Sequence, residues 1–243
     1  MSSKQDYSLQ KLALVVDSNA SVRMSLDYLF GVVCRRNVQT MSDWVEAVRV
    51  LTCGPVPEIV VVGCFGTNNG HLEMIRTAAA MTPKPLVIAV DHEGTPENGV
   101  SAFLAGADEV VRLPFSLMEF ALRLRGRMEA FGIVSEFDFG TDDDWDAEAH
   151  VAHQAGLTSA EAQVLRVLIR RDGKIVSREE LSRAIDNRPW DYGDRKFDVH
   201  VGKIRKKLKM TFDARISVRT IRSAGYRLTM NETDSRASKN NQE

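Results

Sequence analysis

Residues 194–209 combine many cationic side chains with a regular apolar spacing. Four apolar residues fall three or four positions apart, which predicts an amphipathic helix with one buried stripe. These four are Phe197, Val201, Ile204 and Leu208. The other sides carry Arg195, Lys196, His200, Lys203, Arg205, Lys206, Lys207 and Lys209. Such a helix can neutralise phosphates in a nucleic-acid groove, although the segment alone is equally typical of a solvated surface helix.

The elements around this segment predict a winged helix-turn-helix. Capping boxes at 158–161 and 177–180 mark the starts of two helices. After the cationic helix, two alternating segments at 216–221 and 226–230 flank a Ser-Ala-Gly turn, which predicts a β-hairpin. A cationic helix between a capped helix pair and a hairpin is therefore interpreted as a recognition helix.

Charge is distributed unevenly along the 243 residues, which are enough for two domains. Residues 1–156 hold 12 Lys and Arg against 21 Asp and Glu, whereas residues 157–230 hold 18 against 9. An acidic half followed by a basic half indicates a control domain joined to a nucleic-acid-binding domain.

The first half alternates short apolar runs with helical patterns, which predicts an α/β domain with a doubly wound, five-stranded parallel sheet. The expected strands are 12–16, 38–40, 59–62, 85–90 and 109–113. The expected helices are 21–33, 44–51, 72–81, 100–105 and 117–130.

An acidic stretch separates the two halves. Residues 135–150 hold seven carboxylates and no Lys or Arg, which predicts a solvated linker. A linker that competes with DNA for the basic domain, or that contains short strands at 136–139 and 147–152, is the alternative. The expected division is a receiver-like domain at 1–132, an acidic linker at 133–150, a winged-helix domain at 151–230 and a disordered tail at 231–243.

Several site classes are not expected. No apolar run could span a membrane, and residues 1–11 do not resemble a secretory signal. Cys34, Cys53 and Cys64 lack metal-binding spacing and suit a reducing cytoplasm. Residues 66–70 are rich in Gly and Asn but lack the Lys-Ser/Thr of a phosphate loop. We expect a cytoplasmic protein that is not an enzyme and that has no metal or cofactor.

Four motifs make the interpretation specific. In order along the chain they are LTSAEAQVLRVL, GKIVSREEL, RKFDVHVGKIRKKL and VRTIRSAGYRL. Together they closely resemble the DNA-binding domain of OmpR/PhoB-type response regulators. The first half resembles the receiver domain of that family through LVVD, PEIVVV, PLVIAV and GADEVVRLPF. The resemblance implies a transcription regulator of a two-component system that acts on double-stranded DNA.

The resemblance also shows where the phosphorylation switch of a receiver is lost. Asp17 matches the first acidic position, but Ser18 occupies the second. Gly63 stands where the family has its acceptor aspartate, Val90 replaces the hydroxyl residue and Leu113 replaces the lysine. Without a carboxylate no acyl phosphate forms, and without oxygen ligands Mg²⁺ is not held. The resemblance thus implies regulation without aspartyl phosphorylation; modification of another residue is the alternative.

Dimerisation does not need that chemistry. By resemblance, Glu109 and Arg123 match an ion pair in the symmetric receiver interface of the family, although unpaired surface charges are the alternative. Gly99 and Gly126 stand where charged partners are common. We expect a homodimer whose input is its abundance, a partner protein or an unknown ligand.

By resemblance, the recognition helix enters the major groove. Asp198, Val199 and Lys203 match positions that face bases, where Asp can accept from cytosine, Val can contact a thymine methyl and Lys can donate to guanine. Gly202 occupies a position that often carries Arg; it either allows close approach or is incidental. The positions expected to contact the phosphate backbone are Arg195, His200, Arg205 and Lys206.

The hairpin and the loop before the recognition helix supply the remaining site residues. Arg222 matches the residue that reaches the minor groove. Thr220 and Tyr226 match positions that contact phosphate or pack, and a core role for Tyr226 is an equal alternative. Trp190 lies in the loop that contacts RNA polymerase in this family, or anchors that loop. The second candidate function for the whole chain is a protein-interaction module with vestigial DNA binding.

Overall fold

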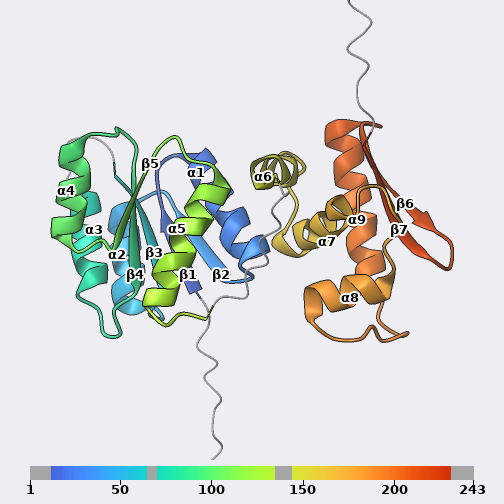
Figure 1. The fold of residues 1–243 in the computed structure, drawn as a ribbon, viewed down its shortest axis with the longest axis horizontal. Coiled ribbons are helices and arrows are strands. Elements are labelled where there is room, and N and C mark those ends of the chain that lie inside the picture. The colour runs from blue at the N-terminus through green and yellow to red at the C-terminus, as the bar shows by residue number, and fades with distance from the viewer. Residues whose placement is uncertain (1–11, 65–69, 135–143, 231–243) are drawn as a thin grey trace, which may run out of the picture. The chain divides into compact units, whose positions relative to one another are not determined.

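The computed structural model describes residues 12–64, 70–134 and 144–230. The chain divides into two compact units, Met1–Ala149 and His150–Glu243 (Figure 1). In the described residues, no helix combines the length and the apolar character needed to cross a membrane. The predicted tail at 231–243 and the alternative strand at 136–139 lie outside the described residues.

The first unit is built on a five-stranded sheet with the strand order β2-β1-β3-β4-β5. All neighbouring strands are parallel, which confirms the predicted doubly wound fold. Strands β1, β3 and β4 are almost entirely buried, as expected for central strands covered on both faces. The strands are β1 Leu12–Val16, β2 Asn37–Met41, β3 Ile59–Cys64, β4 Leu86–Asp91 and β5 Glu109–Arg112.

Helices cover the sheet on two sides, with α2 and α3 on one side and α1 and α5 on the other (Figure 1). Buried Leu51 and Met74 pack with strand residues on the first side. On the second, the Phe30 and Phe120 rings meet edge to face with their centroids 6.4 Å apart. The helices are α1 Ala20–Tyr28 with a π-helical segment Leu29–Val33, α2 Trp44–Cys53, α3 Gly70–Ala79, α4 Pro96–Ala105 and α5 Leu117–Ala130.

The second unit contains the predicted winged helix-turn-helix. Both capping boxes are present, at Thr158 with Glu161 and at Ser177 with Glu180. The predicted apolar stripe of the cationic helix is buried at all four positions and faces a core that includes α7 and both hairpin strands. The elements are α7 Ser159–Arg170, α8 Arg178–Asp186, α9 Lys196–Phe212 and the antiparallel strands β6 Ile216–Ile221 and β7 Gly225–Met230.

The hairpin is fastened to the loop between α7 and α8. The backbone N–H groups of Val176 and Tyr226 each donate to the carbonyl of the other, at 2.8 and 2.9 Å. Gly225, with φ of 144°, comes so close to this loop that an added Cβ would lie 2.0 Å from the Val176 oxygen. Only glycine fits here, and the contact fixes the hairpin relative to α8.

The alternative of a strand at 147–152 is wrong, because Trp145–Gln154 form helix α6. The Asp144 carboxylate accepts the Ala147 N–H at 3.0 Å and so caps the helix. The Tyr28 hydroxyl donates to Glu148 at 2.5 Å, and Trp145 is buried. The end of the acidic segment is therefore packed secondary structure, not a solvated chain.

Candidate nucleic-acid interface

The exposed side of α9 and the turn between β6 and β7 carry cationic side chains that form no hydrogen bond or ion pair within the described residues. In the described part of the chain, Lys203, Lys206 and Arg222 are exposed and make no hydrogen bond or ion pair. Val199 lies on the same helix with 53% of its surface exposed, and Arg195 is exposed at the start of α9. These five predicted site residues are thus available to an external ligand.

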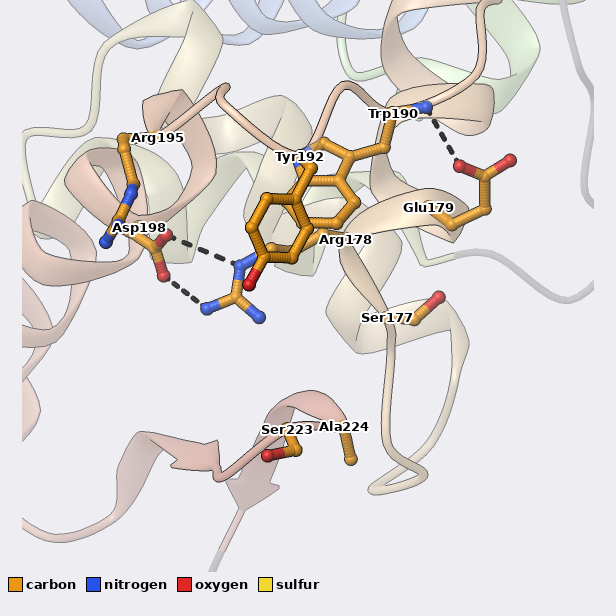
Figure 2. A pocket seen from close by; sticks show the side chains of 9 residues that line it. All are labelled: Ser177, Arg178, Glu179, Trp190, Tyr192, Arg195, Asp198, Ser223 and Ala224. Carbon is orange, nitrogen blue, oxygen red and sulfur yellow. Dashed lines mark hydrogen bonds and ion pairs between the residues drawn. The ribbon is translucent and has the colours of Figure 1, made fainter.

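Asp198 differs from these residues because both of its oxygens are engaged. Arg178 donates to Oδ1 from Nη2 at 2.6 Å and to Oδ2 from Nε at 3.4 Å, as Figure 2 shows. The hydroxyl of buried Tyr226 donates to Oδ1 at 2.6 Å. Arg178 was not among the predicted site residues; it begins α8 and lies twenty residues from Asp198.

This network shifts the ionisation of its members. The hydrogen bond from Arg178 lowers the pKa of Asp198, and the same bond raises the pKa of Arg178. The pKa of Tyr226 is raised chiefly by burial and, to a smaller extent, by the hydrogen bond to Asp198. Asp198 therefore stays a carboxylate at neutral pH, and it ties α8, α9 and the hairpin together.

A pocket of about 450 Å³ opens beside this network (Figure 2). Arg178 and Arg195 bring positive charge to it, and Asp198 lies between them in the view. The start of α8 forms part of the wall, and the carboxylates of Glu179 and Asp198 balance the charge of the two arginines. The lining residues are Ser177, Arg178, Glu179, Trp190, Tyr192, Arg195, Asp198, Ser223 and Ala224.

Trp190 is held firmly in the loop before α9. Its backbone N–H donates to the Glu179 carboxylate at 2.8 Å, and its indole N–H donates to the Asp194 carbonyl at 3.2 Å. The backbone hydrogen bond from Trp190 lowers the pKa of Glu179. These contacts support the anchoring role of Trp190, whereas a contact with RNA polymerase stays a prediction.

Other cations of α9 form contacts within the second unit. Arg205 donates to the Val218 carbonyl and to the Thr220 hydroxyl, both at 2.9 Å, and so fastens α9 to β6. Lys207 donates to buried Glu161 at 2.6 Å. His200 is half-buried, and its Nδ1 has no hydrogen-bond partner in the described residues. A count of cations in the sequence does not distinguish Arg205 and Lys207, which have internal partners, from Lys203 and Lys206, which have none within the described residues.

In the first unit, three of the positions matched by resemblance to a phosphorylation site lie at the ends of the central strands: Asp17, Gly63 and Val90. Gly63 pairs in register with buried Val90. An added Cβ at Gly63 would lie 2.3 Å from Oδ2 of Asp17, so the Asp17 carboxylate fills that space. The same oxygen lies 2.8 Å from Nε2 of His92, a residue that no sequence motif had singled out.

The remaining positions of this site offer no obvious ligands. Ser18 is exposed directly after Asp17, and Leu113 is half-buried after β5. Among the described residues, no group of three or more His, Cys, Asp or Glu side chains could hold a metal ion.

The predicted dimer residues are paired within the chain. The Glu109 carboxylate lies 3.6 Å from Nη1 of Arg123 and 2.6 Å from Nε of Arg127. Nearby on α4, Phe103 and Leu104 are 50% and 85% exposed. Gly99 in α4 and Gly126 in α5 have no side chain that could form an ion pair.

The comparisons with known proteins agree with this architecture. Residues 152–228 match the family model described as "Transcriptional regulatory protein, C terminal". The chain is 28% identical over 230 residues to regulatory protein VirG of Agrobacterium tumefaciens (strain 15955), covering 89% of this chain and 84% of that protein. It is 28% identical over 234 residues to the phosphate regulon transcriptional regulatory protein PhoB of Rhizobium meliloti (strain 1021), covering 90% and 99%.

Among solved structures, the BeF3-activated DrrB receiver domain has a TM-score of 0.43 and 21% identity, and the match covers 49% of this chain and 98% of that chain. The matched C-terminal family and the similarity over about nine tenths of the chain to VirG and PhoB support a DNA-binding transcription regulator that is similar to response regulators of OmpR/PhoB type.

Proposed function

We propose that the chain binds specific sites on double-stranded DNA and regulates transcription without aspartyl phosphorylation. The observation that carries this proposal is the set of exposed cations on α9 and the hairpin turn that have no partner within the described residues. Exposed cations without internal partners can exchange counterions for DNA phosphates at little structural cost.

We assign base contacts and phosphate contacts to different residues, according to which side chains lack a partner within the described residues. Val199 and Lys203 would contact base edges in the major groove, and Arg222 would enter the minor groove. Arg195 and Lys206 would contact phosphates and set the register of the helix. Base contact by Asp198 would compete with its bonds to Arg178 and Tyr226, so we assign the reading of sequence chiefly to Val199 and Lys203. His200, Arg205 and Thr220 remain candidates for backbone contact.

Independence from phosphorylation is supported by the chemistry of the receiver-like unit. Gly63 supplies no carboxylate, and Val90 and Leu113 supply neither a hydroxyl nor an ammonium group. The buried Asp17 carboxylate lies over Gly63 and blocks the space that an acceptor side chain would need. Control would then come from abundance, from a partner protein or from an unknown ligand.

The face formed by α4, β5 and α5 is the proposed dimer surface. Its exposed apolar side chains, Val100 and Phe103, line a pocket with Arg123 and can be covered by a second copy, and the Glu109–Arg123 pair lies beside them. A dimer would place two α9 helices on paired half-sites. The anchored Trp190 loop is the proposed contact for RNA polymerase.

The test is genome-wide mapping of bound sites, followed by affinity measurements on a mapped duplex at several salt concentrations. We expect a steep loss of affinity with salt, and we expect Lys206→Ala to reduce the magnitude of the log–log slope by about 0.9. Arg49→Ala, which removes one exposed charge from the first unit, is the control and should leave the slope unchanged. A flat salt response without sequence preference would refute the proposal.

The protein-interaction module is the second candidate, favoured by the exposed apolar side chains of α4. It predicts that Lys203→Ala and Arg222→Ala leave the regulatory phenotype intact. Loss of regulation in both variants, with normal protein levels, would exclude it.

A further inference from the structure

Asp17 and His92 join two strands that are not neighbours in the sheet. Asp17 follows β1 and His92 follows β4, while β3 lies between these strands. Nε2 of His92 and Oδ2 of Asp17 are 2.8 Å apart. The contact is largely shielded from water, because 13% of the His92 side chain and 1% of the Asp17 side chain are exposed.

This bridge passes over Gly63 at the end of β3. An added Cβ at Gly63 would lie 2.3 Å from Oδ2 and 2.5 Å from Cγ of Asp17. Any larger residue would have to displace the Asp17 carboxylate, whose Oδ2 is the atom that contacts His92. The glycine that removes the acceptor carboxylate is therefore also the residue that lets the bridge form.

The segment that carries His92 is fixed on its other side by Asp91. Oδ1 of Asp91 accepts the N–H groups of Glu93 and Gly94 at 3.1 and 3.0 Å, and it lies 3.4 Å from the side-chain amide of Asn98 in α4. Oδ2 of Asp91 lies 3.5 Å from Nε of Arg112 at the end of β5. The loop between β4 and α4 is thereby tied to α4 and β5, and His92 supplies its tie to β1.

We propose that the Asp17–His92 bridge holds the loop between β4 and α4, together with the start of α4, in one fixed conformation. The site that has lost its acceptor residue is thus converted into an internal clamp. The proposal does not rest on DNA binding, because every residue of the clamp lies in the first unit.

The test is hydrogen–deuterium exchange of the full chain, resolved to peptides that cover 17–23 and 91–99. His92→Ala removes a shielded hydrogen bond to a carboxylate, so exchange in both peptides should become about tenfold faster. Gly63→Ala should have the same effect although His92 is intact, because the methyl group displaces Asp17. His150→Ala, which removes an exposed imidazole, is the matched control and should change neither peptide.

A second pair of variants distinguishes loss of the Asp17–His92 bridge from unfolding of the first unit. His92→Gln places an amide nitrogen near the position of Nε2 and should retain slow exchange, whereas His92→Asn is too short to reach Asp17 and should lose it. Exchange at the wild-type rate in His92→Asn or Gly63→Ala would overturn the proposal. Equal acceleration in the Gln and Asn variants would also overturn it.

Discussion

Replacing Asp198 by alanine should destabilise the second unit far more than a surface change would. The substitution removes the acceptor of the buried Tyr226 hydroxyl and the partner of Arg178. A hydrogen bond to a charged group contributes about 1.5–3 kcal/mol, and the Arg178 pair contributes less because 24% and 34% of the two side chains are exposed. We therefore expect a loss of about 2 kcal/mol in the free energy of unfolding of this unit.

The assay is urea unfolding monitored through amide exchange in α7 and α9. Exchange in these two helices reports on the second unit alone. Arg183→Ala is the control, because it breaks a surface pair with Glu179 and should change the free energy of unfolding by less than about 0.5 kcal/mol. Equal stabilities of Asp198→Ala and wild type would refute the reasoning. If Asp198→Ala instead alters the preference at one base pair without any loss of stability, Asp198 contacts a base as the sequence predicted.

The same network predicts a pH dependence with a defined sign. The pKa of Asp198 is lowered in the folded state from an ordinary value of 3.8, so its contribution is fully present above that pH. The contribution is lost as the pH falls through the lower folded-state pKa. The wild type should therefore lose stability below about pH 4 more steeply than Asp198→Asn. Parallel stability curves for the two proteins would contradict this assignment.

Three further predictions concern glycines and a thiol. Gly225→Ala should lower the free energy of unfolding by more than about 2 kcal/mol in thermal denaturation, because of its positive φ and its contact with Val176; an unchanged melting temperature would contradict this. Burial raises the pKa of Cys64 to about 12, so iodoacetamide at pH 8 should modify exposed Cys53 but not Cys64, as intact and peptide mass would show. Gly63→Asp should gain no phosphoryl group from acetyl phosphate and Mg²⁺, because Val90 and Leu113 supply neither a hydroxyl nor an ammonium group and Ser18 supplies no second carboxylate; an increase in mass by one phosphoryl group would contradict this.

Features encoded locally in the sequence were predictable. The apolar runs of β1, β3 and β4 mark central strands because both faces of the sheet are covered. The stripe from Phe197 to Leu208 and the two capping boxes fixed the helices of the second unit, because their spacing follows the period of the helix itself.

Contacts between distant residues were not predictable. His92 and Asp17 are 75 residues apart, and no spacing rule connects them. Arg178 resembles any other cation in the sequence until α8 and α9 bring it to Asp198. Helix α6 was missed for a different reason: acidic composition suggested a solvated chain, although Trp145, Ala149 and Ala152 have helical spacing and are buried.

The most direct test of the central claim compares DNA binding before and after treatment with a phosphodonor. The full-length chain would be titrated onto a mapped duplex and a scrambled duplex at one salt concentration, untreated and after acetyl phosphate with Mg²⁺, with intact mass recorded in parallel. We predict equal affinities before and after treatment, no added phosphoryl group and a preference of about 10³ or more for the mapped site. Sequence-specific binding that appears only together with an added phosphoryl group would contradict the account.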